Sequence, residues 1–317
     1  MCVQRRGPVI VDGDGAVQVP QVDPLAEAKF KLAQESEGVT WGHREERLVR
    51  ERIELLALAA KAPRERDKPR VPRNYYEAVL DHNWSSWKQA MDREMDNMED
   101  FGTWELVPRP EGKNVMSCKW VFKVKRDMSG SVHSLKARLA CRGFTQREGL
   151  DFGATWAPTC RMRVFRMLMA EASADPSVMT AQWDCTAAFL HAEVDYEMYM
   201  EQAPGYARNK RDFVYRLRRA IYGCKQSSRL FHNVVKEALI GLGAKQAKAD
   251  ECLFLFKEGD SWMRVLVHVD DFACTFNCRR LYDKIYGAMR AKFKITDYGG
   301  VPIFRFLGIC VERTEEG

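Results

Sequence analysis

The sequence predicts an α+β fold, in which helices and strands mix without the regular strand–helix alternation of a doubly wound sheet. Two observations favour this class. Stretches with apolar residues three or four positions apart predict helices, and short alternating or continuous apolar runs predict strands. These two kinds of segment follow each other irregularly along the 317 residues, of which 46% are hydrophobic. This composition is sufficient for one large core or two smaller ones.

The first 72 residues are expected to form a charged N-terminal extension, partly disordered and partly helical. Strong helix formers dominate residues 44–61. The charged, proline-bearing stretch at 64–72 is typical of a linker. The compact part is expected over residues 73–317, and no function is assigned to the extension.

The compact part opens with a helix and a hairpin. Tryptophans and methionines recur three or four positions apart over 84–98, the pattern of a helix with one buried stripe, and Gly102 can end this helix. Strands are expected at 120–125 and 136–142, joined by a turn at 127–130.

The remaining segments complete the irregular mixture of elements. Helices are expected at 163–174, 225–242 and 281–293. Strands are expected at 178–183, 213–217, 252–256 and 304–311. Two more strands are expected within 263–276, one on each side of residues 270–271. The first of these helices must stop before Pro176, and the second ends at two nearby glycines.

Basic residues are concentrated between positions 113 and 147. The net charge of the chain is only +6, but this segment holds nine lysines and arginines against a single acidic residue, with aromatic residues interleaved. Such a pattern favours a polyanion such as a phosphate backbone or a nucleotide, although a solvated sheet face would also explain it. Alternation over 136–142 places Lys136, Arg138, Ala140 and Arg142 on one face of the strand.

Composition also argues against several classes of protein. No run of 18 apolar residues predicts a membrane-spanning helix, and the start lacks the apolar stretch of a secretory signal. The ten scattered cysteines form no Cys-x-x-Cys pair, which indicates reduced thiols in a cytosolic or nuclear protein. His191-Ala-Glu193 matches half of a zinc deaminase signature, but the required Pro-Cys-x-x-Cys half is missing. We expect His191 to be a surface residue.

Three aspartates stand out because they interrupt or follow apolar runs. Asp270 and Asp271 lie between two such runs, and Asp184 follows a third. Aspartate is depleted in strands, so a turn or a cation must favour it at these places. If the strand that ends at Asp184 lies beside the hairpin that carries the pair, the three carboxylates meet. Carboxylates of this kind bind Mg²⁺, and two such ions support phosphoryl transfer in polymerases.

The order of short motifs resembles the reverse transcriptase domain of copia-type retrotransposon polyproteins. Each motif is weak alone, but the ordered set, from about residue 77 to residue 311, is specific. The clearest are Lys119-Trp-Val-Phe-Lys-Val-Lys125, Lys136-Ala-Arg-Leu139, Arg142-Gly-Phe-Thr-Gln146, Gln182-Trp-Asp-Cys-Thr-Ala-Ala-Phe-Leu190, Tyr222-Gly-Cys-Lys-Gln-Ser227, Val269-Asp-Asp271 and Phe306-Leu-Gly-Ile309.

This resemblance implies a fingers–palm polymerase fold with an antiparallel palm sheet and flanking helices. It implies RNA-directed DNA polymerase activity, in which Asp184, Asp270 and Asp271 hold two Mg²⁺ ions, with Mn²⁺ as an alternative. The implied partners are an RNA or DNA template with its primer and deoxynucleoside triphosphates, without a membrane. The implied location is the cytoplasm, within virus-like particles, or the nucleus. The oligomeric state is left open.

The resemblance also assigns residues around the incoming nucleotide. Lys136 and Arg138 would contact the triphosphate, with Lys119 and Lys123 as weaker candidates. Phe189 would lie under the sugar and exclude a 2′-hydroxyl, although an ordinary core phenylalanine is the alternative. The loop residues that would pack on the template base and nucleotide are Gly223, Lys225 and Gln226. Phe306-Leu-Gly-Ile309 would steady the primer end.

The sequence departs from the family pattern at several positions. His268 stands beside the aspartates where tyrosine is usual, and Cys224 replaces leucine. Thumb and ribonuclease H segments are expected to be absent or incomplete before residue 317. Two other functions therefore stay open: an inactive or co-opted nucleic-acid-binding remnant of such a polymerase, and a metal-dependent nuclease that uses the same carboxylates.

Overall fold

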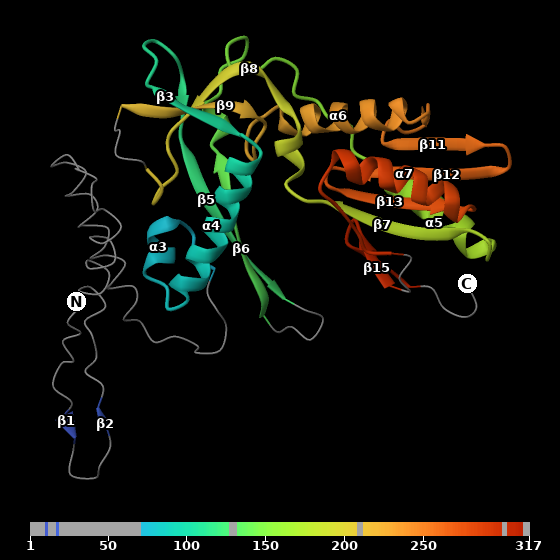
Figure 1. Ribbon diagram of the computed structural model, residues 1–317, viewed down its shortest axis with the longest axis horizontal. Coiled ribbons are helices and arrows are strands. Elements are labelled where there is room, and N and C mark those ends of the chain that lie inside the picture. The colour runs from blue at the N-terminus through green and yellow to red at the C-terminus, as the bar shows by residue number, and fades with distance from the viewer. Residues whose placement is uncertain are drawn as a thin grey trace. The chain divides into compact units, whose positions relative to one another are not determined.

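The structure is a computed structural model that describes residues 10–11, 17–18, 71–126, 132–207, 212–299 and 303–312 (Figure 1). These residues belong to two compact units. The second unit contains residues 91–120, 138–203, 212–299 and 303–312, and the first contains the others. Nearly all of the N-terminal extension lies outside the described residues, so its expected disorder and helix stay predictions.

The elements follow one another in the irregular order expected of an α+β protein. The helices are α3 (Tyr75–Val79), α4 (Trp84–Asp100), the short 3₁₀ helix η1 (Gly143–Thr145), α5 (Met162–Ala174), the 3₁₀ helix η2 (Ala188–His191), α6 (Ser227–Gly241) and α7 (Arg279–Lys292). The strands are β1 (Ile10–Val11), β2 (Val17–Gln18), β3 (Trp104–Pro108), β4 (Val115–Met116), β5 (Cys118–Arg126), β6 (Val132–Cys141), β7 (Met179–Cys185), β8 (Glu193–Met200), β9 (Phe213–Arg219), β10 (Lys245–Gln246), β11 (Leu253–Glu258), β12 (Ser261–His268), β13 (Asp271–Phe276), β14 (Ile295–Asp297), β15 (Ile303–Phe306) and β16 (Ile309–Glu312).

The predicted helix and hairpin at the start of the compact part are confirmed. The apolar stripe of α4 is buried at Trp87, Met91, Met95 and Met98, as the three- and four-residue spacing requires. Strands β5 and β6 pair with each other. Ala140 and Cys141 of β6 are both buried, so the expected placement of Ala140 on the face of Lys136 and Arg138 stays a prediction.

The end of β6 is buried because another segment of the second unit packs against it. The Cys141 amide donates a hydrogen bond to the Tyr222 carbonyl at 2.8 Å, and the Arg142 amide donates to the Ser117 carbonyl at 2.8 Å. These backbone bonds hold the edges of the strand, and the burial of the consecutive residues Ala140 and Cys141 indicates that both of its faces are covered there.

The second unit is built around a six-stranded sheet with the order β10-β11-β12-β13-β7-β14. All neighbouring strands in it are antiparallel. Val265 and Val267 of β12 point to one face, where they pack with α6 and α7, and Leu266 points to the other, where it packs with α5 and Phe306. Burial on both faces explains the continuous apolar run. The predicted antiparallel sheet with flanking helices is confirmed.

A four-stranded sheet in the same unit has the order β3-β9-β8-β4, and its β4–β8 pair is parallel. Strands β3 and β8 were not expected from the sequence, and neither was β14, which is only three residues long.

The nine cysteines among the described residues are free, and seven of them are buried, so the predicted thiols are confirmed there. Within that same part of the chain, no helix is long and apolar enough to cross a bilayer.

Candidate active site

Two neighbouring strands of the six-stranded sheet bring the three aspartates together. Asp271, the first residue of β13, is the cross-strand partner of Asp184 near the end of β7. The Cys185 amide donates a hydrogen bond to the Asp270 carbonyl at 2.8 Å. The expected proximity of position 184 to positions 270 and 271 is therefore confirmed. It is fixed by the backbone pairing of β7 with β13 and does not depend on the conformations of the side chains.

The tip that carries the Asp pair is strained. His268 and Asp271 are cross-strand partners, so only Val269 and Asp270 form the turn between β12 and β13. Val269 has a φ of 54°, and a β-branched side chain rarely adopts this left-handed conformation. Such strain costs roughly 1–3 kcal/mol and is characteristic of functional sites. The strained conformation of Val269 therefore lowers the stability of the folded protein at the turn that carries Asp270.

One row of the sheet places four polar side chains on the same face. His268, Asp271, Asp184 and Thr296 are consecutive cross-strand partners on β12, β13, β7 and β14. Directly opposite residues in antiparallel strands project to the same side, with Cβ atoms about 4.5–5.5 Å apart. Asp184 and Asp271 therefore face the same space, between a histidine and a threonine.

Repulsion among the carboxylates is visible in Asp271. Burial, together with the negative charges of Asp270 and Asp184, raises the pKa of Asp271 to about 6, although a hydrogen bond with Gln182 opposes the shift. A divalent cation would relieve this repulsion, because hard carboxylate oxygens are its preferred ligands. The chemistry of the donors fits Mg²⁺ or Mn²⁺.

The expected three-carboxylate ligand set is nevertheless not assembled in this structure. Among the described residues, no three histidine, cysteine, aspartate or glutamate side chains are grouped so that they could hold a metal ion. The backbone positions are adjacent, but the side chains would have to turn toward a common ion. Metal binding by Asp184, Asp270 and Asp271 stays a prediction.

Replacing Asp271 by asparagine is expected to stabilise the metal-free protein at pH 8. The folded state holds the Asp271 proton more tightly than the unfolded chain, in which the pKa is about 3.9. The carboxylate therefore destabilises the folded state increasingly as the pH rises from about 4 to about 6, and fully above that range. Because solvent screens a partly exposed group, we expect a gain of about 1 kcal/mol at pH 8 and none near pH 4.

Urea unfolding in the presence of a chelator measures this difference at both pH values. Asp96→Asn, on an exposed position of α4, is the control for a general change in net charge. A gain for Asp271→Asn that is equal at pH 4 and pH 8, or no gain at pH 8, would contradict the carboxylate repulsion.

A cationic and aromatic stack lies beside the Asp pair. The Arg138 guanidinium is 4.6 Å from the centre of the Tyr222 ring, and the Tyr222 and Phe189 rings pack edge to face with their centres 4.7 Å apart. The pKa of the Tyr222 phenol is raised to about 12, mainly by burial and to a smaller extent by the Asp270 charge, while Arg138 opposes the shift. Arg138, Tyr222 and Phe189 therefore form one group within electrostatic range of Asp270.

Arg138 carries an unused donor in this stack. Its Nε atom is buried and has no hydrogen-bond partner within the part of the chain that is described. A buried donor without a partner is costly, so an anionic ligand at this place would satisfy it. Tyr222 was missing from the residues proposed on sequence grounds, although it opens the motif that contains Gly223.

The loop after Tyr222 is fixed by a polar network. The Lys225 amide donates to Gln146 Oε1 at 2.8 Å, and Gln146 Nε2 donates to Gln226 Oε1 at 2.9 Å. Gln226 Nε2 in turn donates to the Asp151 carbonyl at 2.9 Å. Gln226 is fully buried, so in this structure it supports the loop from within. The Lys225 ammonium lies 4.3 Å from the centre of the Phe152 ring.

The remaining residues predicted to contact the nucleotide or the primer lie in different parts of the fold. Lys136 and Lys123 belong to the first compact unit, and Lys119 is an exposed residue of the second. The roles of these lysines stay predictions. Phe306 is buried in the core beneath α5, and its ring lies 6.4 Å from that of His268. The hairpin expected to steady the primer therefore packs beside the carboxylate row.

Two histidines have partly buried rings. His268 Nδ1 lies 3.6 Å from Cys160 Sγ, and burial lowers the pKa of His268 while the Asp270 charge opposes this shift. The expectation that His191 is a surface residue is confirmed only in part, because its side chain is half-buried. Its ring packs against Phe101 at 4.8 Å and Phe293 at 5.2 Å, because η2 folds back onto the core after β7.

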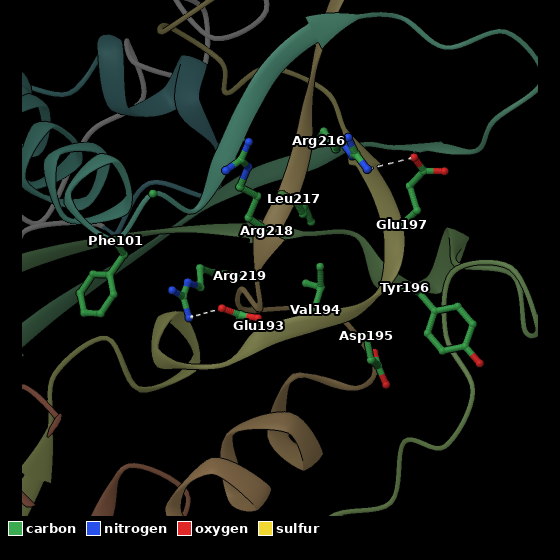
Figure 2. Close-up of a pocket in the computed structure, with 11 residues that line it drawn as sticks. Phe101, Glu193, Val194, Asp195, Tyr196, Glu197, Arg216, Leu217, Arg218 and Arg219 are labelled. Carbon is green, nitrogen blue, oxygen red and sulfur yellow. Dashed lines mark ion pairs between the residues drawn. The ribbon is translucent and has the colours of Figure 1, made fainter.

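A separate open cavity of about 740 Å³ lies on the four-stranded sheet, and its lining does not include Asp184, Asp270 or Asp271 (Figure 2). Acidic side chains of β8 and arginines of β9 line most of it. Figure 2 shows ion pairs between Glu193 and Arg219 and between Glu197 and Arg216. Asp195 pairs with Arg229. Because its acids are paired, we interpret this cavity as the solvated face of the sheet.

Comparison with known proteins agrees with the motif order. A family model described as reverse transcriptase (RNA-dependent DNA polymerase) matches residues 101–317. The retrovirus-related Pol polyprotein from transposon RE2 of Arabidopsis thaliana is 34% identical over 248 residues, which cover 78% of this chain and 17% of that protein. The corresponding polyprotein from transposon TNT 1-94 of Nicotiana tabacum is 30% identical over 247 residues, which cover 77% of this chain and 18% of that protein.

The chain thus spans less than a fifth of the length of these relatives. A solved foamy viral protease–reverse transcriptase in complex with double-stranded DNA aligns with 95% of this chain and 50% of its own, with a TM-score of 0.39 and 12% identity. This likeness is too distant to support a conclusion about fold or partners. Because the family model matches more than half of the chain, the chain belongs to the reverse transcriptase (RNA-dependent DNA polymerase) family, in the group of copia-type retrotransposon Pol polyproteins.

Proposed function

We propose that this chain is an RNA-directed DNA polymerase domain that adds deoxynucleotides to a primer 3′-hydroxyl. One observation carries the proposal: the direct pairing of Asp184 with Asp271 beside Asp270, within electrostatic range of the Arg138–Tyr222–Phe189 stack. Carboxylates for cations, a guanidinium for phosphate and rings for a sugar and base are the groups that nucleotide transfer needs.

Each group has a defined part in this proposal. Asp184 and Asp270, with a smaller contribution from Asp271, would hold two divalent ions, whose chemistry is to activate the primer oxygen and to neutralise phosphate charge. Arg138 would donate its unpaired Nε–H to the triphosphate. Phe189, held against Tyr222, would lie under the sugar and reject a 2′-hydroxyl by steric exclusion.

The arrangement also supports a fingers–palm reading of the fold. The six-stranded antiparallel sheet that carries the aspartates corresponds to a palm, and the β5–β6 hairpin corresponds to the fingers. The expected template–primer, deoxynucleotides and cytoplasmic or nuclear location belong to the same proposal. The basic segment from Lys113 to Arg147 supports a polyanionic partner.

Primer extension on poly(rA)/oligo(dT) tests the proposed reaction with the full 317-residue chain. We expect incorporation of dTTP in the presence of Mg²⁺, much lower incorporation of UTP, and none in the presence of a chelator. The matched control is a reaction in which noncomplementary dATP is the sole nucleotide.

Two other outcomes would each point to a different function. Salt-sensitive binding of the hybrid without incorporation would identify a nucleic-acid-binding remnant and overturn the proposed synthesis. Metal-dependent cleavage of the template in the absence of nucleotides would identify a nuclease.

A further inference from the structure

An exposed tyrosine lies on the same face of the sheet as the aspartates. Strand β14 is the outermost neighbour of β7, and Thr296 is the cross-strand partner of Asp184. Side chains alternate along a strand, so Tyr298, two residues after Thr296, faces the same side. The Tyr298 amide donates a hydrogen bond to the Gln182 carbonyl at 2.9 Å, which continues the pairing with β7 by one residue.

The surroundings of Tyr298 differ from those of an ordinary surface tyrosine. Its side chain is 53% exposed, yet its phenol is close enough to the site to respond to two of the aspartates. Partial burial raises the pKa of Tyr298, and the charges of Asp184 and Asp271 raise it further. The phenol therefore stays protonated at neutral pH and is available as a hydrogen-bond donor.

The position of Tyr298 indicates which part of the substrate its hydroxyl could contact. Asp184 and Asp271 would hold cations, and the ligands of such cations in nucleotide transfer include phosphate oxygens. His268 and Phe306, on the hairpin side of the carboxylate row, lie across β13 and β7 from β14. A donor on the β14 side is thus separated from the expected primer side, and it lies on the face of the carboxylates that would hold the phosphate-binding cations.

We propose that Tyr298 is a positioning residue whose hydroxyl donates a hydrogen bond to a phosphate oxygen of the nucleoside triphosphate. This inference rests on the proposed function, since it takes the three aspartates as the nucleotide site. Alternation in β14 supports it independently, because Asp297 points to the opposite face, where it accepts a hydrogen bond from Tyr282 at 2.5 Å. The residue acts on the substrate's charged tail and leaves the metal ligands unchanged.

Tyr298→Phe tests the inference because it removes only the hydroxyl. Titration calorimetry with the full chain, Mg²⁺ and a template–primer that ends in a dideoxynucleotide would measure binding without any turnover. We expect Tyr298→Phe to weaken the binding of the complementary deoxynucleoside triphosphate about tenfold. We expect the binding of inorganic pyrophosphate to weaken by a similar factor, and the affinity for the template–primer itself to stay unchanged.

Tyr286→Phe is the matched control, because Tyr286 is on α7 and packs against the opposite face of the sheet. Equal triphosphate binding by the wild type and Tyr298→Phe would overturn the role of Tyr298 and leave the proposed function standing. Weaker template–primer binding with unchanged triphosphate binding would also overturn it. Failure of the wild type to bind any nucleotide would instead overturn the proposed function, and with it this inference.

Discussion

Asp270→Asn is expected to lower the rate of nucleotide addition by at least about a thousandfold, equivalent to roughly 4 kcal/mol of transition-state stabilisation. Asparagine keeps the size of the side chain and its place in the tight turn after Val269, but it removes the negative charge that a divalent ion requires. Asp184→Asn should have the same effect, since its carboxylate occupies the neighbouring strand in direct register with Asp271.

Single-turnover incorporation of one complementary nucleotide measures this loss, and hybrid affinity should remain within about a factor of two of the wild type. The matched control is Asp260→Asn. Asp260 lies in the β11–β12 turn, at the opposite end of β12, and is exposed. Wild-type incorporation by Asp270→Asn would remove the proposed mechanism, whereas equal losses in both variants would indicate general damage to the sheet.

The meeting of the aspartates illustrates what the sequence could predict. Apolar runs on either side of Asp270 and Asp271 predicted two strands, and the run before Asp184 predicted a third. Their register was beyond prediction, because β7 and β13 come from distant parts of the chain and pair through long-range contacts. The helical stripe of α4 needed no such information, since its spacing is local.

The buried glutamine shows where sequence reasoning ends. Gln226 was expected near the template base because it belongs to a family motif, yet its amide bonds to Gln146 and to the Asp151 carbonyl. These partners lie 75–80 residues away along the chain, so no local pattern identifies them.

Strand β8 was missed for another reason. Its alternation over Glu193–Glu197 is clear, but three of these five residues are glutamate or aspartate, which are depleted in strands.

Glycine at position 223 joins this internal network to the candidate site. Its φ is 89°, and a Cβ atom there would lie 2.0 Å from the Cys141 carbonyl oxygen. Neither the backbone of β6 nor that of the loop can move freely, because the Cys141 amide already bonds to the Tyr222 carbonyl. An alanine would therefore have to push the loop away from β6. This displacement would move Tyr222 on one side and Lys225 on the other.

Gly223→Ala is accordingly expected to destabilise the protein by roughly 2–4 kcal/mol, the sum of left-handed strain and a steric conflict between backbones. Nucleotide addition should fall by more than the folded fraction, because Tyr222 supports both Arg138 and Phe189. Urea unfolding and single-turnover incorporation at a temperature where the variant is folded separate the two effects.

Gly243→Ala isolates the contribution of the close approach between the backbones. Gly243 has a φ of 97°, similar to that of Gly223, but no atom of the described residues lies within 4 Å of the place that an added methyl group would take. It should lose about 1 kcal/mol through strain alone and retain full incorporation. Equal losses of stability in the two variants would mean that the loop can yield at Cys141. In that case the position of Tyr222 could not depend on a fixed junction between β6 and the loop, and the arrangement of Arg138 and Phe189 would require another support.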